Sequence, residues 1–149
     1  MITQKAKYAL KAMIHLAQRQ DGKPVLIASM AKEERLPQKF LERILLDLKT
    51  HGLLESRKGK GGGYLLARSP QKISLGEIIR LMDGPLALVS CVSKTAYRRC
   101  KDCPSEERCY LRPIMKEVRD SIARILDGTS LADAVKRADA TIESLTYEI

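Results

Sequence analysis

LPQKFLERILLDLKTHGLLESRKGKGGGYLLA, residues 36–67, contains the pattern that decides the fold of this chain. Its first half predicts a helix that starts at Pro37, since proline is favoured in the first turn of a helix. His51-Gly52 supplies the C-terminal stop of that helix. The predicted helix has one apolar stripe, made of Phe40, Leu41, Ile44, Leu45 and Leu48, with polar side chains mostly on the opposite side.

The second half of the stretch predicts two strands, Leu53–Ser56 and Tyr64–Ala67, joined by a glycine-rich loop with basic residues. A run of three glycines could also suggest a phosphate-binding loop. The nucleotide-binding fingerprints, however, need a helix directly after the glycines, and here a second strand follows. The pattern therefore favours a β-hairpin, whose basic residues are Arg57, Lys58 and Lys60.

Upstream of this stretch, apolar residues at helical spacing predict a helix over residues 3–19 and a second, short helix through about Glu34. The order is then helix, short helix, helix, hairpin, which is typical of a winged helix-turn-helix. We expect a mainly α-helical fold with a small β-hairpin, in which residues 1–70 form the DNA-binding domain.

The charge distribution agrees with a polyanionic partner for this first domain. Residues 1–70 hold 14 Lys and Arg against 6 Asp and Glu, whereas residues 71–149 hold 13 against 12. Basic residues supply the sequence-independent part of DNA affinity, and the second helix of the turn motif enters the major groove. Its polar face offers candidate base readers, among which Glu42 can accept a hydrogen bond from cytosine N4. The predicted DNA-binding residues are Gln38, Lys39, Glu42, Arg43, Arg57, Lys58 and Lys60.

The second half of the chain predicts three further helices. Ser74 and Glu77 have the spacing of a capping box, which predicts a helix over about 74–82. Ser105 can cap a long helix to about Asp127, with a length of roughly 35 Å, and Ser130 can cap a last helix. A palindromic operator requires two-fold symmetry, so we expect a homodimer. The apolar stripe of the long helix is the predicted interface, with Ile114, Val118, Ile122 and Ile125. Residues 71–104 would then be a linker helix with a cysteine loop, and 105–149 the dimerisation and C-terminal helices.

All four cysteines, Cys91, Cys100, Cys103 and Cys109, lie within nineteen residues. The N-terminus lacks the apolar core of a signal peptide, so we expect a cytoplasmic protein, in which disulfides are disfavoured. Four thiolates suit zinc or an iron–sulfur cluster, and a thiol switch without metal is the third alternative. An enzyme is disfavoured, because no βαβ pattern surrounds Cys100-x2-Cys103 and no catalytic triad or Walker loop is present.

Three segments carry a resemblance to a known family. ITQKAKYALKAMIHLA resembles the opening helix of the IscR/NsrR/CymR (Rrf2) family of bacterial winged-helix regulators. LPQKFLERILLDLKTHGLLESRKGKGGGYLLAR resembles its recognition helix and wing, and ISLGEIIRLMDGP its linker helix. The resemblance covers almost the whole chain. It implies a dimeric, operator-binding transcription factor, expected to be a repressor, that senses iron, redox state or nitric oxide through a 2Fe–2S or 4Fe–4S cluster.

The resemblance also implies roles for individual residues. Glu42 falls on the family's cytosine-reading glutamate, and Lys58 on a wing arginine that enters the minor groove. The family's three cluster ligands fall on Cys91, Cys103 and Cys109.

This chain departs from the family pattern around its cysteines. The gap between Cys91 and Cys103 is longer than usual, and Cys100 is an additional cysteine. Arg112 and Lys7 occupy the positions where other branches place a fourth ligand, and neither side chain can serve. Cys100 is therefore the expected fourth ligand, with zinc or no metal as the alternatives.

Overall fold

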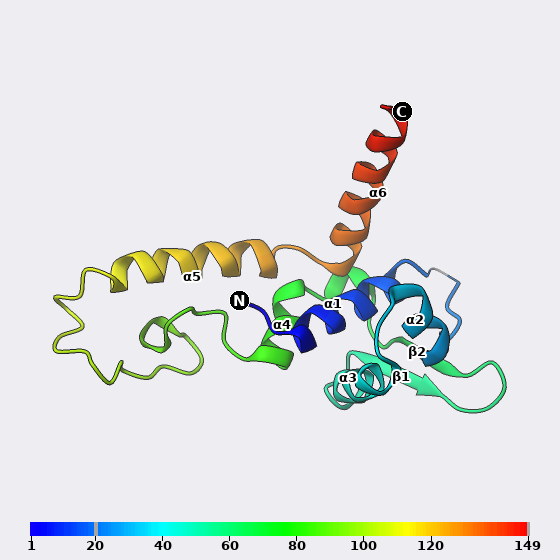
Figure 1. Ribbon diagram of the computed structural model, residues 1–149, viewed down its shortest axis with the longest axis horizontal. Helices are drawn as coiled ribbons and strands as arrows, with labels where there is room; N and C mark the ends of the chain where they lie inside the picture. The colour runs from blue at the N-terminus through cyan, green and yellow to red at the C-terminus, as the bar shows by residue number, and fades with distance from the viewer. Residues whose placement is uncertain (20, 149) are drawn as a thin grey trace.

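The computed structural model describes residues 1–19 and 21–148 as an elongated molecule of helices with one small hairpin (Figure 1). The elements, in chain order, are α1 (Gln4–Ala17), α2 (Ile27–Glu34), α3 (Gln38–Thr50), β1 (Leu54–Arg57), β2 (Gly63–Leu66), the 3-10 turn η1 (Pro70–Lys72), α4 (Leu75–Asp83), the 3-10 turn η2 (Ser90–Val92), α5 (Arg112–Asp127) and α6 (Leu131–Tyr147). Among these residues, no helix combines the length and apolar character needed to cross a membrane.

The core lies between the first three helices, the base of the hairpin and the start of α4. Side chains from all of these elements are fully buried in one continuous cluster, as expected when each amphipathic helix buries its apolar stripe. The largest of them are Met13, Met30, Leu41, Ile44, Leu45, Leu48, Leu53, Ile73 and Ile78. Leu131 from α6 joins the same cluster, so the core also holds the base of the C-terminal helix.

The hairpin is held to the helices by a short third strand-like segment. β1 and β2 pair in an antiparallel register from Leu54–Leu66 to Arg57–Gly63. Val25 then bridges Tyr64 on the other side of β2: its N–H donates to the Tyr64 carbonyl at 2.8 Å, and the Tyr64 N–H donates back at 2.9 Å. A two-stranded hairpin alone is marginally stable in water, so this bridge is an important anchor for the wing.

Glycine is required at Gly63, where β2 meets the Val25 segment. Its φ is +144°, and an added Cβ would lie 2.2 Å from the Val25 carbonyl oxygen. That distance is far inside van der Waals contact, and the obstacle is backbone that is itself held by hydrogen bonds. The GGG run is therefore explained, at its last glycine, by close approach of two backbone segments.

A rigid joint connects α4 to α5. Arg80 of α4 donates two hydrogen bonds to Asp127 at the end of α5, from Nη1 to Oδ1 at 2.6 Å and from Nη2 to Oδ2 at 2.8 Å. Two parallel bonds between planar groups fix orientation as well as distance. Gly76 of α4 leaves room for the carboxylate, because a Cβ there would lie 2.0 Å from Asp127 Oδ1.

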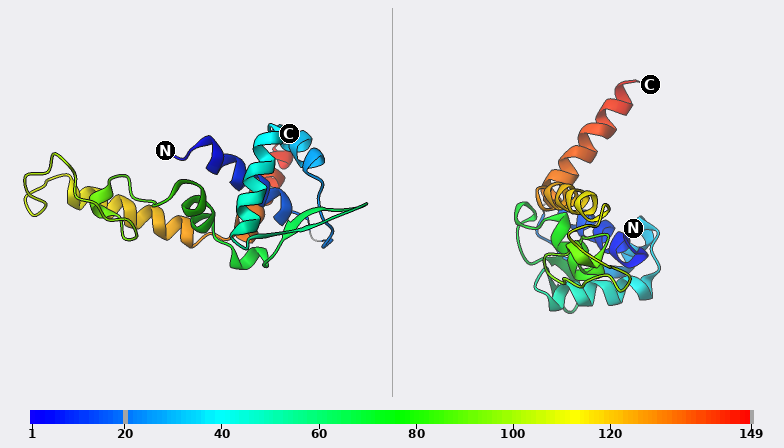
Figure 2. Two further views of the ribbon diagram at one scale, coloured as in Figure 1. Left: turned by 90° about the horizontal axis from the view of Figure 1, so that it is seen from below. Right: turned by 90° about the vertical axis from the view of Figure 1, so that its left-hand side faces the viewer.

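The C-terminal helix α6 leaves the body of the molecule at a steep angle (Figures 1 and 2). Ser130 and Asp133 form a complete capping box at its start. Leu131, Val135, Ala138, Ile142 and Leu145 follow one another at heptad spacing along it. Only the first two pack on the core, while Ile142 and Leu145 are exposed.

Three expectations from the sequence are wrong in detail. The long helix starts at Arg112 and not at Ser105, so it is roughly 24 Å long and not 35 Å. Pro113 stands in its first turn, where a missing N–H costs nothing. Phe40 does not belong to the buried stripe of α3, since it is exposed and its ring edge packs on Tyr8 with centroids 5.6 Å apart.

Candidate nucleic-acid interface and cysteine loop

The exposed face of α3 carries the polar residues that the sequence singles out. Leu41, Ile44, Leu45 and Leu48 are buried beneath it. Gln38, Lys39, Glu42 and Arg43 all point to solvent. Gln38 Nε2 donates to Glu42 Oε1 at 3.4 Å, which links two of them one turn apart. The face is therefore free to contact a partner and is chemically varied enough to discriminate among base edges.

Contacts from two neighbours hold α3 in place. Lys5 of α1 lies 3.0 Å from Asp47 of α3 in an ion pair. Lys49, near the end of α3, donates to Ser56 of β1 at 2.7 Å. These contacts fix the helix relative to both α1 and the wing, so a docked partner would meet a preformed surface.

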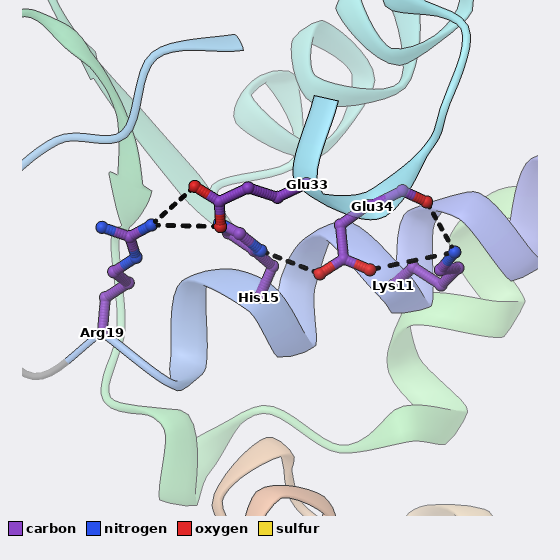
Figure 3. Close-up of polar contacts among 5 residues, drawn as sticks. All are labelled: Lys11, His15, Arg19, Glu33 and Glu34. Carbon is purple, nitrogen blue, oxygen red and sulfur yellow. Dashed lines mark hydrogen bonds and ion pairs between the residues drawn. The ribbon is translucent and has the colours of Figure 1, made fainter. Parts of the chain in front are cut away.

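A polar bracket fastens α2, the first helix of the turn motif, to α1 (Figure 3). His15 of α1 is 5% exposed, and its Nδ1 donates to Glu34 Oε1 at 2.8 Å. Lys11 donates to the Glu34 backbone carbonyl at 2.8 Å, and Arg19 lies 3.4 Å from Glu33 Oε1. The bracket determines how the α2–α3 pair sits on α1. His15 therefore has a structural role between α1 and α2 and does not belong to the exposed face of α3.

The wing presents three basic side chains beside α3. Arg57, Lys58 and Lys60 are all exposed. Within residues 1–19 and 21–148, none of them forms an ion pair within 4.0 Å. Glycines at 59 and 61 have positive φ and turn the tip sharply. The wing can therefore place several uncompensated positive charges against a polyanion.

The cysteine loop lies between α4 and α5, at the opposite end of the molecule from the wing (Figures 1 and 2). Cys91 is buried in η2, whereas Cys100, Cys103 and Cys109 are partly exposed, and all four are free thiols. A side-chain hydrogen bond with Cys91, followed by desolvation, raises the pKa of the Cys100 thiol. The Cys103 N–H donates to the Cys100 carbonyl at 3.2 Å, which places Cys103 in the next turn.

Arginines hold the loop to α5. Arg112 donates to the Cys91 carbonyl at 3.5 Å, and Arg119 donates to the neighbouring Val92 carbonyl. Arg99 donates to the Cys103 carbonyl at 3.1 Å. These guanidinium groups supply positive charge next to the thiols, which would favour an anionic group bound there.

The loop has the donor chemistry of an iron–sulfur or zinc site but not the assembled geometry. In the part of the chain that the structure describes, no three Cys, His, Asp or Glu side chains converge closely enough to hold a metal ion. The expected set of Cys91, Cys100, Cys103 and Cys109 is thus only partly brought together, with Cys91 and Cys100 as its paired members. A cluster held by all four would require the segment around Cys103 and Cys109 to move toward that pair.

The fold and the interface define the class of this protein. Three helices and a hairpin, with an exposed polar third helix and a basic wing, form a winged helix-turn-helix. Such a domain is used by regulators of transcription.

Comparison with known proteins identifies the family. The chain belongs to the Rrf2 family, described as "Iron-dependent Transcriptional regulator", whose profile matches residues 2–137. It is 41% identical over 136 residues to an Rrf2-like HTH-type transcriptional regulator of Rhodobacter capsulatus, covering 89% of this chain and 91% of that one. Among solved structures, CymR, described as the global cysteine regulator of Bacillus subtilis, has a TM-score of 0.77 at 30% identity, with 92% and 97% covered. IscR of T. potens has a TM-score of 0.73 at 30% identity, with 93% and 88% covered.

The chain is therefore a DNA-binding transcriptional regulator and not an enzyme. The resemblance seen in the sequence to the IscR/NsrR/CymR family is confirmed. The description of one relative and the description of the family refer to different signals, since CymR is described as a cysteine regulator and the family as iron-dependent.

Proposed function

We propose that this regulator binds an operator as a homodimer and senses its signal through an iron–sulfur cluster held by the cysteine loop. The observation that carries the DNA-binding part is the pairing of an exposed polar face on α3 with an uncompensated basic wing. The operator would be palindromic, because two identical protomers related by a two-fold axis present two identical reading helices.

Each interface residue has a proposed role that follows from its place. Gln38, Lys39, Glu42 and Arg43 would face the major groove, where Glu42 accepts from cytosine N4 and Arg43 donates to guanine or phosphate. Arg57, Lys58 and Lys60 would contact phosphates or the minor groove beside it. Glu42 is the acidic member of an otherwise basic surface. The carboxylate of Glu42 would be repelled by DNA phosphates, and a hydrogen bond to a base would offset that repulsion.

Replacing both Lys58 and Lys60 by Ala is expected to weaken binding to every duplex and to lower the salt dependence of binding. Each lysine that neutralises a phosphate releases counterions, so the slope of log affinity against log salt should fall by about one to two. Fluorescence anisotropy with operator and random duplexes over a range of salt concentrations measures both effects. An unchanged slope would remove the wing from the DNA interface.

Glu42→Ala is the matched control for that experiment, because it changes charge on the reading helix instead of the wing. It should leave the salt slope nearly unchanged and relax the preference at one C·G pair, by about 1–3 kcal/mol of discrimination. Selection from a randomised operator library would measure it. The two variants therefore separate base reading from phosphate contact.

The proposed dimer interface is the outer face of α5. Ile114 and Ile125 are 55% and 56% exposed. Val118 and Ile122 are half-buried, so they contact both their own protomer and the proposed interface. Isolated exposed isoleucines are ordinary, but two on one face of an apolar stripe on a helix favour packing against a second helix.

The double substitution Ile114→Asp/Ile125→Asp is expected to yield monomers. Both side chains are exposed in the protomer, so the charges should not disturb its fold, whereas in a dimer they would be buried. Loss of two apolar contacts should weaken association by about 3 kcal/mol or more, which light scattering after gel filtration would detect. Leu26→Asp, at the equally exposed N-cap residue that precedes α2, is the control. A dimer that survives the double substitution would place the interface elsewhere.

The proposed cluster ligands are Cys91, Cys100, Cys103 and Cys109. Their thiols supply the ligand set that iron–sulfur clusters use, and the basic residues Arg99 and Arg112 lie against their backbone. When bound, the cluster would supply a redox-active and iron-dependent group at the loop end of α5. The description of the family as iron-dependent supports the same choice.

A thiol switch is the second candidate, and the influence of Cys91 on the pKa of the Cys100 thiol supports these two cysteines as its redox pair. Oxidation of that pair by a cellular oxidant would form a disulfide and release two protons and two electrons. The absorption spectrum and the metal and sulfide content of protein purified without oxygen distinguish the candidates. Iron together with sulfide in the purified protein supports the cluster. Zinc without iron or sulfide contradicts the cluster and supports a structural zinc site. Metal-free protein with a Cys91–Cys100 disulfide supports the thiol switch.

A further inference from the structure

A cleft of about 870 Å³ opens between the DNA-binding domain and the C-terminal helix, far from the cysteine loop. One wall is the end of α1 and the segment that leads from it to α2, a second is the chain that leaves β2, and the third is one face of α6. Leu16, Val25, Leu66 and Val135 give it an apolar lining. The volume and lining fall within the range of small-molecule sites.

The charges that line this cleft are segregated by wall. Arg19, Lys23 and Arg68 stand on the side of the DNA-binding domain, and Asp139 and Glu143 stand one turn apart on α6. Arg19 and Arg68 already pair with Glu33 and Glu77, at 3.4 and 2.5 Å. Among the described residues, Lys23, Asp139 and Glu143 form no ion pair within 4.0 Å. Lys136 is the one cation on the α6 wall.

The cleft is separate from the surfaces already assigned. The six residues of α6 that line it are Ala132, Val135, Lys136, Asp139, Ala140 and Glu143. None of the proposed DNA-binding residues of α3 and the wing, and none of the proposed dimerisation residues of α5, is among the residues that line the cleft. DNA docked on α3, or a second protomer packed on the outer face of α5, would therefore not use the residues of the cleft.

We infer that this cleft binds a small zwitterion of the amino-acid class. Its carboxylate would lie on the wall that holds Arg19, Lys23 and Arg68, and its ammonium group between Asp139 and Glu143. The apolar lining would receive the side chain. A simple anion would meet the two carboxylates of α6, and a simple cation would meet the three basic groups opposite, so only a ligand with both charges is matched on both walls.

Such a ligand would bridge α6 and the segment that continues directly from the wing. Ala67, Arg68 and Ser69 follow β2 and line the cleft, so occupancy would restrain the base of the wing. The effect on operator affinity rests on the proposed function, but binding to the cleft does not. Ligand binding to the cleft and its effect on operator affinity are measured separately, so either can be contradicted without the other.

The test is isothermal titration calorimetry of the intact protein with each of the standard amino acids. At least one should bind, and its N-acetyl and amide derivatives, which keep only one of the two charges, should bind at least about tenfold more weakly. If no amino acid binds, or if a single-charge derivative binds equally well, the inference is overturned.

Asp139→Asn/Glu143→Gln locates the site. This variant keeps size and helical position, so its circular dichroism and thermal unfolding should match wild type, while affinity for the amino acid should fall at least about tenfold. Glu117→Gln/Glu148→Gln removes two negative charges at exposed positions outside the cleft, one on α5 and one at the C-cap of α6, and should bind normally. Equal affinity in the wild type and the Asp139/Glu143 variant would overturn the assignment to this cleft, whatever the result with DNA.

Discussion

Cys91→Ala protein, purified and reconstituted without oxygen, is expected to bind almost no iron or sulfide and to lack the brown colour of an iron–sulfur protein. Cys91 is the one buried thiol of the four, held in η2 by hydrogen bonds from α5 to the carbonyls of Cys91 and Val92. A cluster that loses this fixed ligand keeps only ligands on the longer, more exposed part of the loop. Cys103→Ala and Cys109→Ala should lose iron to a similar extent, measured as iron and sulfide per protomer.

Cys100→Ala is expected to differ from the other three. Cys100 is the additional cysteine of this chain, so its loss should leave three ligands and a cluster that is altered or more easily lost. Ser105→Ala, in the same loop but without a thiol, is the control and should behave as wild type. Wild-type protein that takes up stoichiometric zinc and neither iron nor sulfide would contradict the cluster, as would protein that takes up no metal.

Gly63→Ala is expected to destabilise the DNA-binding domain by about 3 kcal/mol or more. The new Cβ would lie 2.2 Å from the Val25 carbonyl oxygen and 2.9 Å from the Leu26 nitrogen, and the residue would keep a φ that L-amino acids rarely adopt. Relief requires separation of β2 from Val25, which breaks the two hydrogen bonds that anchor the wing. Urea unfolding followed by circular dichroism would measure the loss as a lower midpoint.

Gly61→Ala is the matched control for that experiment. Gly61 also has a positive φ, +77°, but no atom lies within 4 Å of an added Cβ. Only the backbone preference is then violated, with a cost of about 1–2 kcal/mol. If the two variants are destabilised equally, the contact between Gly63 and Val25 does not restrain the wing.

Much of the fold could be predicted from the sequence because local signals agree with one another. The periodic apolar residues of α3, the glycines that separate β1 from β2, and the serines that cap α4 and α6 each act over a few residues. Ser74 accepts a hydrogen bond from the Glu77 N–H, and Ser130 from Asp133, as the capping patterns predict. The predicted winged helix-turn-helix is confirmed by the structural similarity to CymR and IscR.

The predicted start of α5 at Ser105 is wrong because the position of Pro113 outweighs the capping chemistry of Ser105. Ser105 has the chemistry of an N-cap, but a helix from that point would place Pro113 in its interior. There proline removes a hydrogen bond and its ring clashes with the preceding turn. In the first turn of a helix that starts at Arg112 the same residue is favourable.

The arrangement of the cysteines and the charged cleft could not be predicted, since both depend on tertiary packing. Nothing in the spacing indicates that Cys91 would contact Cys100 before Cys103 or Cys109. The cleft likewise combines residues from 16–19 and 22–25, from 65–71 and from 132–143, which are brought together only when α6 packs on the core. Sequence patterns report which face of a helix is buried, but not which distant segment it will meet.

The joint between Arg80 and Asp127 has a mechanical consequence. With α4 packed on α1 and locked to α5 by two hydrogen bonds, each protomer has little internal freedom between its cysteine loop and its reading helix. A conformational change in the loop would therefore rotate the protomer as a rigid body together with α5. In the proposed dimer, the crossing angle of the two α5 helices would then set the distance between the two reading helices, and with it the preference for operator over random DNA.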